Sequence, residues 1–221
     1  MSSPEIAQQT PEWHAQRLGK LTASRIADIM ARTKTGWSAS RSNYAAQLVA
    51  ERLTGTVQDG FTTAAMAWGI ETEPHAKAAY EFKCDVDIAP AGFVDHPSIE
   101  MSGASPDGYI GEDGLIEIKC PNIATHIDTL LGAAIDGRYV KQMQWQMACT
   151  GRQWCDFASF DPRLPPEMQL HVRRVYRDDA MIADLEKQGA AFLNELSALV
   201  DELHTRFMLK RQLGASVEAA E

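Results

Sequence analysis

The segment SPDGYIGEDGLIEIKC, residues 105–120, places two short apolar runs on either side of a Gly-Glu-Asp-Gly sequence. Such a sequence is a strong turn signal, so we expect the two runs to pair as a β-hairpin. Successive residues of a strand point to opposite faces, so Glu117 and Lys119 share one face while Ile116 and Ile118 point into the core. The hairpin therefore predicts that a carboxylate and an ammonium project side by side from a sheet.

Asp107 adds a second carboxylate, because it lies ten residues before Glu117 and the turn folds it back toward that residue. Two converging carboxylates repel each other unless a cation lies between them. Carboxylate oxygens suit Mg²⁺ or Mn²⁺, and the backbone carbonyl of Ile118 is a natural further ligand. Lys119 would then orient or deprotonate a water, or neutralise charge on a phosphate.

The Glu-x-Lys spacing also has a simpler explanation. A second copy, Glu81-Phe82-Lys83, closes a predicted helix, where residues two apart do not share a face, and no hairpin brings an Asp to it. We therefore assign that copy no function. For the copy at 117–119, the spacing alone is equally consistent with an ion pair on the surface of an edge hairpin.

Charge is unevenly distributed along the chain. The net charge of −9 argues against simple nucleic-acid binding, which usually needs a basic domain. Residues 13–52, however, carry seven Lys or Arg against two Asp or Glu, whereas residues 178–221 carry four against nine. A chain polarised in this way can hold a polyanion at one end, although both segments could also be ordinary solvated helix faces.

The order of secondary-structure elements indicates the fold class. Helices are expected over residues 22–32, 42–55, 62–83, 137–151 and 178–212. We expect Ser42 to cap the second of them and Gly69, Pro74 and Gly189 to interrupt the longer ones. β-like segments cover residues 85–97, the hairpin, 154–162 and 169–177. This order predicts an α/β fold with a mixed central β-sheet flanked by helices and a long C-terminal helix.

Length and composition predict one domain. A chain of 221 residues, 45% of them apolar, can bury one sizeable core over residues 1–221. We expect an N-terminal helical part at about 13–60, a core at about 61–177 and a C-terminal helical segment at 178–221. No stretch reaches the roughly 18 apolar residues of a membrane span, and the N-terminus lacks the order of a signal peptide. We therefore expect no membrane association and a cytoplasmic location.

Five blocks of the sequence resemble one nuclease family, in that family's order. They are WHAQRLGKLTAS (13–24), AWGIETEPHA (67–76), GASPDGYI (103–110), IEIKCP (116–121) and YVKQMQWQM (139–147). The hairpin resembles the signature of the PD-(D/E)xK nuclease superfamily. The whole set resembles its viral recombinase branch, the lambda exonuclease or YqaJ-type family, up to about Arg177. The resemblance implies a restriction-endonuclease-like core.

The resemblance also implies roles for individual residues. Asp107 and Glu117 match the family's metal-binding carboxylates, and Lys119 matches its catalytic lysine. Glu73 matches an acidic helix residue that faces the active site, where it would bind a second metal ion or a water on the metal. Without the resemblance, Glu73 would be taken for a solvated helical carboxylate.

Further residues match positions that the family uses to hold DNA. Those for the 5′-terminal phosphate are Arg17, Ser24, Ser105 and Gln142. A guanidinium, hydroxyls and an amide can jointly coordinate a phosphate, although Ser24 could also cap a helix. Lys34 lies where family members carry basic residues for the DNA backbone, and Met66 lies where an apolar residue could wedge between terminal bases. A flexible loop and a core methionine are the respective alternatives.

By resemblance, the chain is expected to be a Mg²⁺-dependent exonuclease, with Mn²⁺ as a substitute and two ions per active site. It would degrade one strand of duplex DNA from a 5′-phosphorylated end, release 5′-mononucleotides and leave a 3′ overhang for homologous recombination. The family implies a single-strand annealing protein as partner and a closed ring of three subunits, with the basic segment lining its channel. The alternatives are a sequence-specific endonuclease, a nucleotide hydrolase and a non-enzymatic DNA-binding module.

Overall fold

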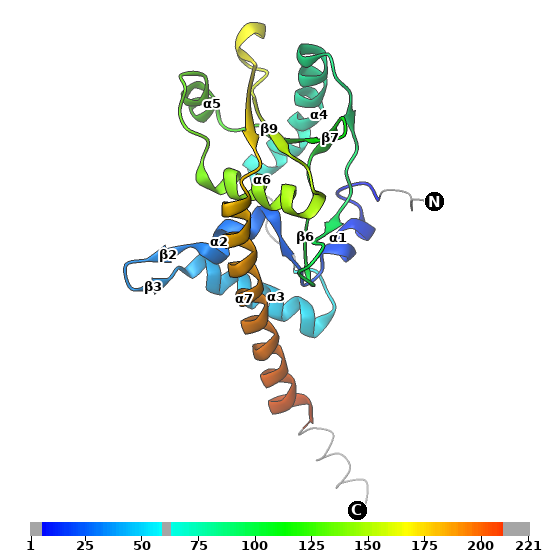
Figure 1. The fold of residues 1–221 in the computed structure, drawn as a ribbon, viewed down its shortest axis with the longest axis vertical. Helices are drawn as coiled ribbons and strands as arrows, with labels where there is room; N and C mark the ends of the chain where they lie inside the picture. The colour runs from blue at the N-terminus through cyan, green and yellow to red at the C-terminus, as the bar shows by residue number, and fades with distance from the viewer. Residues whose placement is uncertain (1–5, 59–62, 210–221) are drawn as a thin grey trace, which may run out of the picture.

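A computed structural model describes residues 6–58 and 63–209, and its central element is a five-stranded sheet (Figure 1). In order across the sheet, the strands are β10 (Leu170–Tyr176), β9 (Trp154–Phe160), β8 (Gly114–Lys119), β7 (Gly108–Ile110) and β4 (Ile88–Ala89). β8 and β9 are parallel, and the other neighbours are antiparallel. The sheet is therefore mixed, as predicted.

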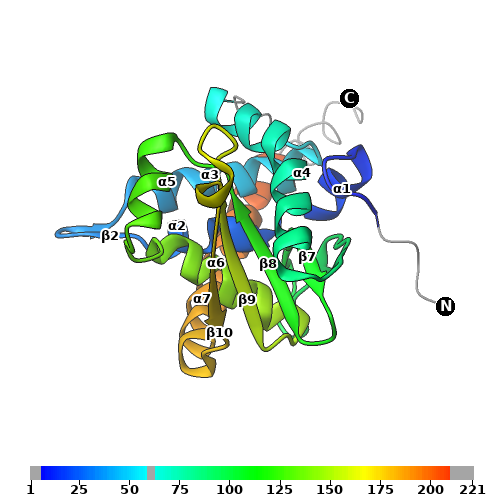
Figure 2. The same ribbon diagram turned by 90° about the horizontal axis from the view of Figure 1, so that it is seen from above.

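Two helices cover the two faces of this sheet (Figure 2). α4 (Ala64–Cys84) packs on the face that carries Ile116 and Ile118. α6 (Gly137–Thr150) packs on the opposite face, which carries Leu115. Both faces of β8 are therefore buried, whereas the alternation of the sequence had assigned only one of them to the core.

A second, smaller sheet lies among the N-terminal helices. Its strands, in order, are β1 (Leu21–Thr22), β6 (Ser102–Ala104) and β5 (Val94–Asp95), and β1 runs parallel to β6. The helical elements around it are α1 (Pro11–Arg17), a 3₁₀ turn (Ala23–Arg25), α2 (Ile26–Met30), α3 (Ala39–Thr54) and α7 (Asp179–Leu203). α2, α3 and α7 share an apolar core with Trp145 of α6.

The remaining elements are short. A hairpin of β2 (Arg32–Thr33) and β3 (Gly36–Trp37) extends from the body (Figure 1). α5 (Ile123–Leu130) follows β8, a 3₁₀ turn (Pro166–Met168) separates β9 from β10, and a π-helix (His204–Leu209) continues α7. None of the helices in the described part of the chain has the length and apolar character needed to cross a bilayer.

Two predicted features of the N-terminal helices are wrong. Ser42 lies inside α3, which begins at Ala39 with Ser38 at the N-cap position. The first turn is fixed by tertiary contacts, because Arg41 donates to the carbonyl of Ile29 at 3.1 Å and forms an ion pair with Glu195 at 2.9 Å. The helix predicted over residues 22–32 is also shorter, because Thr22 belongs to β1 and the next three residues form the 3₁₀ turn.

The predicted interruptions of the longer helices are also wrong. α4 runs through Gly69 and Pro74 without a break. Pro74 removes the N–H partner of the Ile70 carbonyl, but both residues are exposed, so water can hydrate that carbonyl. α7 likewise runs through Gly189, where a Cβ would lie 2.9 Å from Cη2 of Trp145. Glycine at this position allows α7 to approach α6 closely.

We expect Gly189→Ala to destabilise the fold, although alanine has the higher helix propensity. The added methyl group must displace the fully buried ring of Trp145. Overpacking of this kind costs about 1–3 kcal/mol, more than the roughly 1 kcal/mol that alanine gains over glycine in a helix. Gly69→Ala is the matched control, because a Cβ there meets nothing within 4 Å, and it should raise the free energy of unfolding. Urea unfolding followed by circular dichroism measures both changes. Equal stabilisation by the two variants would contradict the packing explanation.

Candidate active site

The β7–β8 hairpin brings Asp107 and Glu117 together, as the turn signal predicted. Gly108 lies opposite Ile116 in the antiparallel register, so the residues one step further along, Asp107 and Glu117, also face each other. The backbone N–H of Ile118 donates to Oδ2 of Asp107 at 2.6 Å. This hydrogen bond fixes the Asp107 carboxylate against the end of β8.

Glu117 is fully buried, with 0% of its surface exposed, and each of its carboxylate oxygens is held by side chains. Oε1 accepts from Nε2 of Gln142 at 2.7 Å and lies 2.5 Å from Nζ of Lys119. Oε2 accepts from Nε2 of Gln146 at 2.6 Å. A buried ionised carboxylate is costly unless it is paired and hydrogen-bonded in this way. The alternative of a surface ion pair is therefore wrong.

The electrostatics of the hairpin reflect this crowding. Burial, and next the negative charge of Glu117, raise the pKa of Asp107 well above its usual value. Burial alone would lower the pKa of Lys119, but the carboxylates of Glu117 and Asp107 outweigh it and raise that pKa. Lys119 is therefore a cation at neutral pH. Perturbed groups that converge in this way are typical of functional sites.

Glu73 lies at the edge of this cluster. It comes from α4, on the other side of the sheet from α6, and forms an ion pair with Lys77 at 2.9 Å. Its charge contributes to the raised pKa of Asp107 and of Cys120. Glu73 is therefore close enough to interact electrostatically with the carboxylates of the hairpin, although its ion pair is with a residue of its own helix.

The donor atoms of the cluster suit a hard divalent cation. Besides burial, the carboxylates of Glu117 and Glu73 both raise the pKa of Asp107, and the half-buried ammonium of Lys119 opposes them only in part. Carboxylate oxygens are the ligands that Mg²⁺ and Mn²⁺ prefer. Within residues 6–58 and 63–209, however, no group of three or more His, Cys, Asp or Glu side chains is already arranged around one metal position.

The residues assigned by resemblance to the 5′-phosphate lie in one region. Ser24 follows β1 and Ser105 follows β6. These two strands are parallel neighbours, so both serines lie at the same end of the small sheet. Nη1 of Arg17 lies 3.4 Å from Oγ of Ser105. α6, which carries Gln142, packs against both β6 and the 3₁₀ turn that contains Ser24. Ser24 does not cap a helix through its side chain, so that alternative is wrong.

Two residues of this region were not found by the sequence analysis. Trp13 donates from Nε1 to Oγ of Ser105 at 3.0 Å, and the Arg17 guanidinium lies 3.9 Å from the centroid of its ring. Gln146, which holds Glu117, is fully buried. A signal existed in both cases, because Trp13 lies four residues before Arg17 and Gln146 four residues after Gln142, the spacing that brings side chains together on a helix.

The two residues matched to DNA contacts lie on exposed positions. Lys34 is at the turn of the β2–β3 hairpin, so this segment is a paired hairpin and not the flexible loop of the alternative interpretation. Met66 is 54% exposed in the first turn of α4, so it is not a core methionine. Elsewhere in the basic segment, Lys20 pairs with Asp95 and Arg41 with Glu195, so part of its positive charge is neutralised within the chain.

Comparison with known proteins adds independent information. The sequence profile described as the YqaJ-like viral recombinase domain matches residues 12–153. Two crystal structures of LHK-Exo, an alkaline exonuclease from Laribacter hongkongensis, one of them in complex with dAMP, are 53% identical in sequence. The alignment covers 89% of this chain and 97% of LHK-Exo, with a TM-score of 0.83. No curated protein matches the chain.

A more distant structure shares the fold. A phage-related exonuclease from Haemophilus somnus is 16% identical, with a TM-score of 0.68 over 83% of this chain and 96% of that one. These similarities, together with the mixed sheet, the flanking helices and the long C-terminal helix, confirm the predicted fold class.

Proposed function

This chain belongs to the YqaJ-like viral recombinase family, and from that premise we propose that it is a Mg²⁺-dependent exonuclease acting on linear duplex DNA. It degrades one strand in the 5′-to-3′ direction, releases 5′-mononucleotides and leaves a 3′ overhang for homologous recombination. The observation that carries the proposal is the buried Glu117, held beside Lys119 and opposite Asp107. The similarity to an alkaline exonuclease supports it.

In the proposed mechanism, Asp107, Glu117 and the carbonyl of Ile118 would hold one ion, and Glu73 would bind a second ion or a water on the metal. When bound, Mg²⁺ or Mn²⁺ would supply Lewis-acid activation of the scissile phosphate. Lys119 contributes a fixed positive charge, which stabilises the negative charge that develops on the phosphate. Gln142 and Gln146 hold Glu117 in one orientation.

Gln142 can serve both the carboxylate and the 5′-phosphate. Its side-chain amide has two N–H donors, and one of them goes to Oε1 of Glu117. The other can donate to a phosphate oxygen beside Arg17, Ser24 and Ser105. This amide would link the position of the terminal phosphate to the position of the catalytic carboxylate.

A test of the phosphate pocket is the choice of DNA end. The wild-type protein should degrade duplexes with 5′-phosphorylated ends faster than duplexes with 5′-hydroxyl ends. Arg17→Ala should lower the ratio of these two rates about 10- to 100-fold and so erase most of the preference, because it removes a charge-assisted hydrogen bond. Arg32→Ala is the matched control, since Arg32 also stacks on a tryptophan, at 3.7 Å from the centroid of Trp37, but outside the pocket. Equal rates on both ends by the wild type would rule the pocket out.

We also propose that three chains close into a ring around the duplex, with a single-strand annealing protein as partner, in the cytoplasm. Exposed apolar residues support self-association. Ile123 and Ile127 of α5 and Leu131 at its C-cap are spaced four residues apart. Phe207 and Met208 lie beyond α7, where the chain extends away from the body (Figure 1). In a ring, the hairpin with Lys34 could face the DNA while the acidic C-terminal segment faces outward or supports a neighbour.

Light scattering at low micromolar concentration tests the ring. It should report about three times the chain mass of 24.4 kDa. Enclosure would also make digestion processive, because a chain that holds only a few phosphates releases DNA readily at physiological salt. A monomer that digests DNA distributively would contradict the ring while leaving the active site unaffected.

A further inference from the structure

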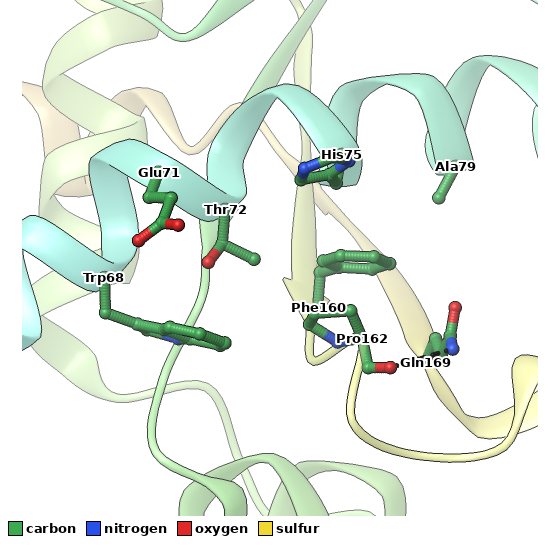
Figure 3. A pocket seen from close by; sticks show the side chains of 8 residues that line it. All are labelled: Trp68, Glu71, Thr72, His75, Ala79, Phe160, Pro162 and Gln169. Carbon is green, nitrogen blue, oxygen red and sulfur yellow. Dashed lines mark hydrogen bonds between the residues drawn. The ribbon is translucent and has the colours of Figure 1, made fainter.

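A cavity of about 470 Å³ lies along α4 (Figure 3), and Asp107, Glu117 and Glu73 are not part of its lining. Trp68 and His75 extend into it from α4, and Phe160 and Pro162 face them from the end of β9 and the segment that follows. The complete lining is Trp68, Glu71, Thr72, His75, Ala79, Phe160, Pro162 and Gln169.

The position of this cavity follows from the helical repeat of α4. Trp68, Thr72, His75 and Ala79 recur every three or four residues and so form one flank of the helix. Glu73 is turned well away from that flank, because successive residues of a helix differ by about 100°. α4 therefore presents Glu73 on one side and the lining of the cavity on another.

The cavity nevertheless adjoins the catalytic end of the sheet. Lys119 is the last residue of β8 and lies opposite Ser159 of the parallel strand β9. Phe160, the next residue of β9, lines the cavity. The cavity therefore begins beside the strand position that faces Lys119, on the face of the sheet that α4 covers.

The chemistry of the lining favours a flat, uncharged ligand. Trp68, His75 and Phe160 offer ring faces, and none of the eight lining residues, all in the described part of the chain, is Lys or Arg. The guanidinium of Arg163 lies 4.7 Å from the centroid of the Trp68 ring, but it forms an ion pair with the buried Asp161 at 2.6 Å. A phosphate would find no free cation here, whereas a base could stack.

Polar groups around the rings suit the edge of such a base. Nε1 of Trp68 is buried and has no hydrogen-bond partner among the described residues. An indole N–H normally finds an acceptor when it is buried, so this one would be satisfied only if the Trp68 ring turned its N–H toward an acceptor atom of a ligand in the cavity. The side chains of Glu71, Thr72 and Gln169 supply further donors and acceptors at the rim.

We propose that this cavity binds one unpaired nucleobase of the strand that is not cut. This inference rests on the proposed function: removing a nucleotide from one strand of a duplex leaves its partner base unpaired. With the cut strand on the Glu73 side of α4, the released partner passes on the Trp68 side and stacks between the rings. The helix then keeps the two strands apart during digestion.

The test is equilibrium binding in EDTA, where no cleavage occurs, to duplexes with a frayed end. The first duplex, called intact, has all of its bases. The second has abasic sites at the 3′-terminal positions of the uncut strand, and the third has them at the 5′-terminal positions of the cut strand. The wild-type protein should bind the duplex with the abasic uncut strand at least about fivefold more weakly than the intact one, the loss expected for one stacked base.

Variants link this loss to the cavity. Trp68→Ala should bind the intact duplex about as weakly as the wild type binds the abasic one, and should lose its sensitivity to abasic sites in the uncut strand. Trp68→Phe keeps a stacking face and should retain most of that sensitivity. Trp37→Ala, which removes an exposed tryptophan on β3, should retain all of it.

Three results would overturn the inference. In the first, the wild type binds the intact duplex and the duplex with the abasic uncut strand equally. In the second, Trp68→Ala remains as sensitive as the wild type to abasic sites in the uncut strand. In the third, Trp68→Ala changes the sensitivity only to abasic sites in the cut strand. Each of these would leave the proposed exonuclease standing, provided that DNA ends are bound. Failure of the wild type to bind any DNA end would overturn both proposals.

Discussion

Replacing Asp107 with Asn should abolish Mg²⁺-dependent cleavage of linear duplex DNA, lowering the rate on the order of 10⁴-fold, as when a member of a catalytic group is removed. Asparagine keeps an oxygen that can accept the 2.6 Å hydrogen bond from the Ile118 N–H, but it removes the negative charge that a cation needs. The fold should survive, because one of two mutually repelling carboxylates becomes neutral. Release of mononucleotides measures the rate, and urea unfolding measures the stability.

Asp113→Asn is the matched control for this change. Asp113 lies at the turn end of the same hairpin, is exposed, and pairs with Gln153 through its backbone carbonyl, which the substitution leaves in place. This variant should cleave DNA at the wild-type rate. Near-normal cleavage by Asp107→Asn would remove Asp107 from the metal site and leave it as a structural partner of Ile118.

Replacing Lys119 with Met should have the second largest effect, a loss of cleavage of about 10²- to 10⁴-fold. The variant keeps the apolar stem of the side chain and loses only its charge. Glu117 remains held by Gln142 and Gln146, so binding of both DNA and Mg²⁺ should persist. Filter binding and calorimetry measure these two affinities separately from the rate.

The second Glu-x-Lys sequence provides the control for Lys119. Lys83 closes α4 and donates to the carbonyl of Leu170 at 2.9 Å, away from the hairpin carboxylates. Lys83→Met should therefore leave cleavage unchanged, although it alters the same three-residue motif. Full activity of Lys119→Met would mean that this lysine only balances the charge of Glu117.

The sequence alone predicted the hairpin and the convergence of Asp107 on Glu117 because both depend on local rules. Alternation along a strand and a Gly-Glu-Asp-Gly turn set the register without reference to the rest of the chain. The predicted helix interruptions at Pro74 and Gly189 were wrong because tertiary packing, not a local rule, decides the conformation there. Packing of α4 on the sheet, and of α7 on Trp145, outweighs the local preference of these residues.

The environment of the site could not be predicted from spacing. Burial of Glu117 depends on α6, which begins twenty residues further along the chain and supplies Gln142 and Gln146. The meeting of Trp13 with Ser105 depends on the parallel pairing of β1 with β6, two strands of two and three residues that leave no recognisable pattern. For the residues assigned to the 5′-phosphate, only the family resemblance pointed to a common role.

The most direct test of the proposed activity is to incubate one plasmid, in linear and in covalently closed circular form, with and without Mg²⁺, and to size the products over time. An exonuclease of the proposed kind should shorten only the linear form, only when Mg²⁺ is present, releasing mononucleotides and leaving about half of the DNA as a single strand. Cutting of the closed circle into discrete fragments would contradict this account and identify an endonuclease. Intact linear DNA after prolonged incubation with Mg²⁺ would contradict it as well, and would leave a protein that only binds DNA.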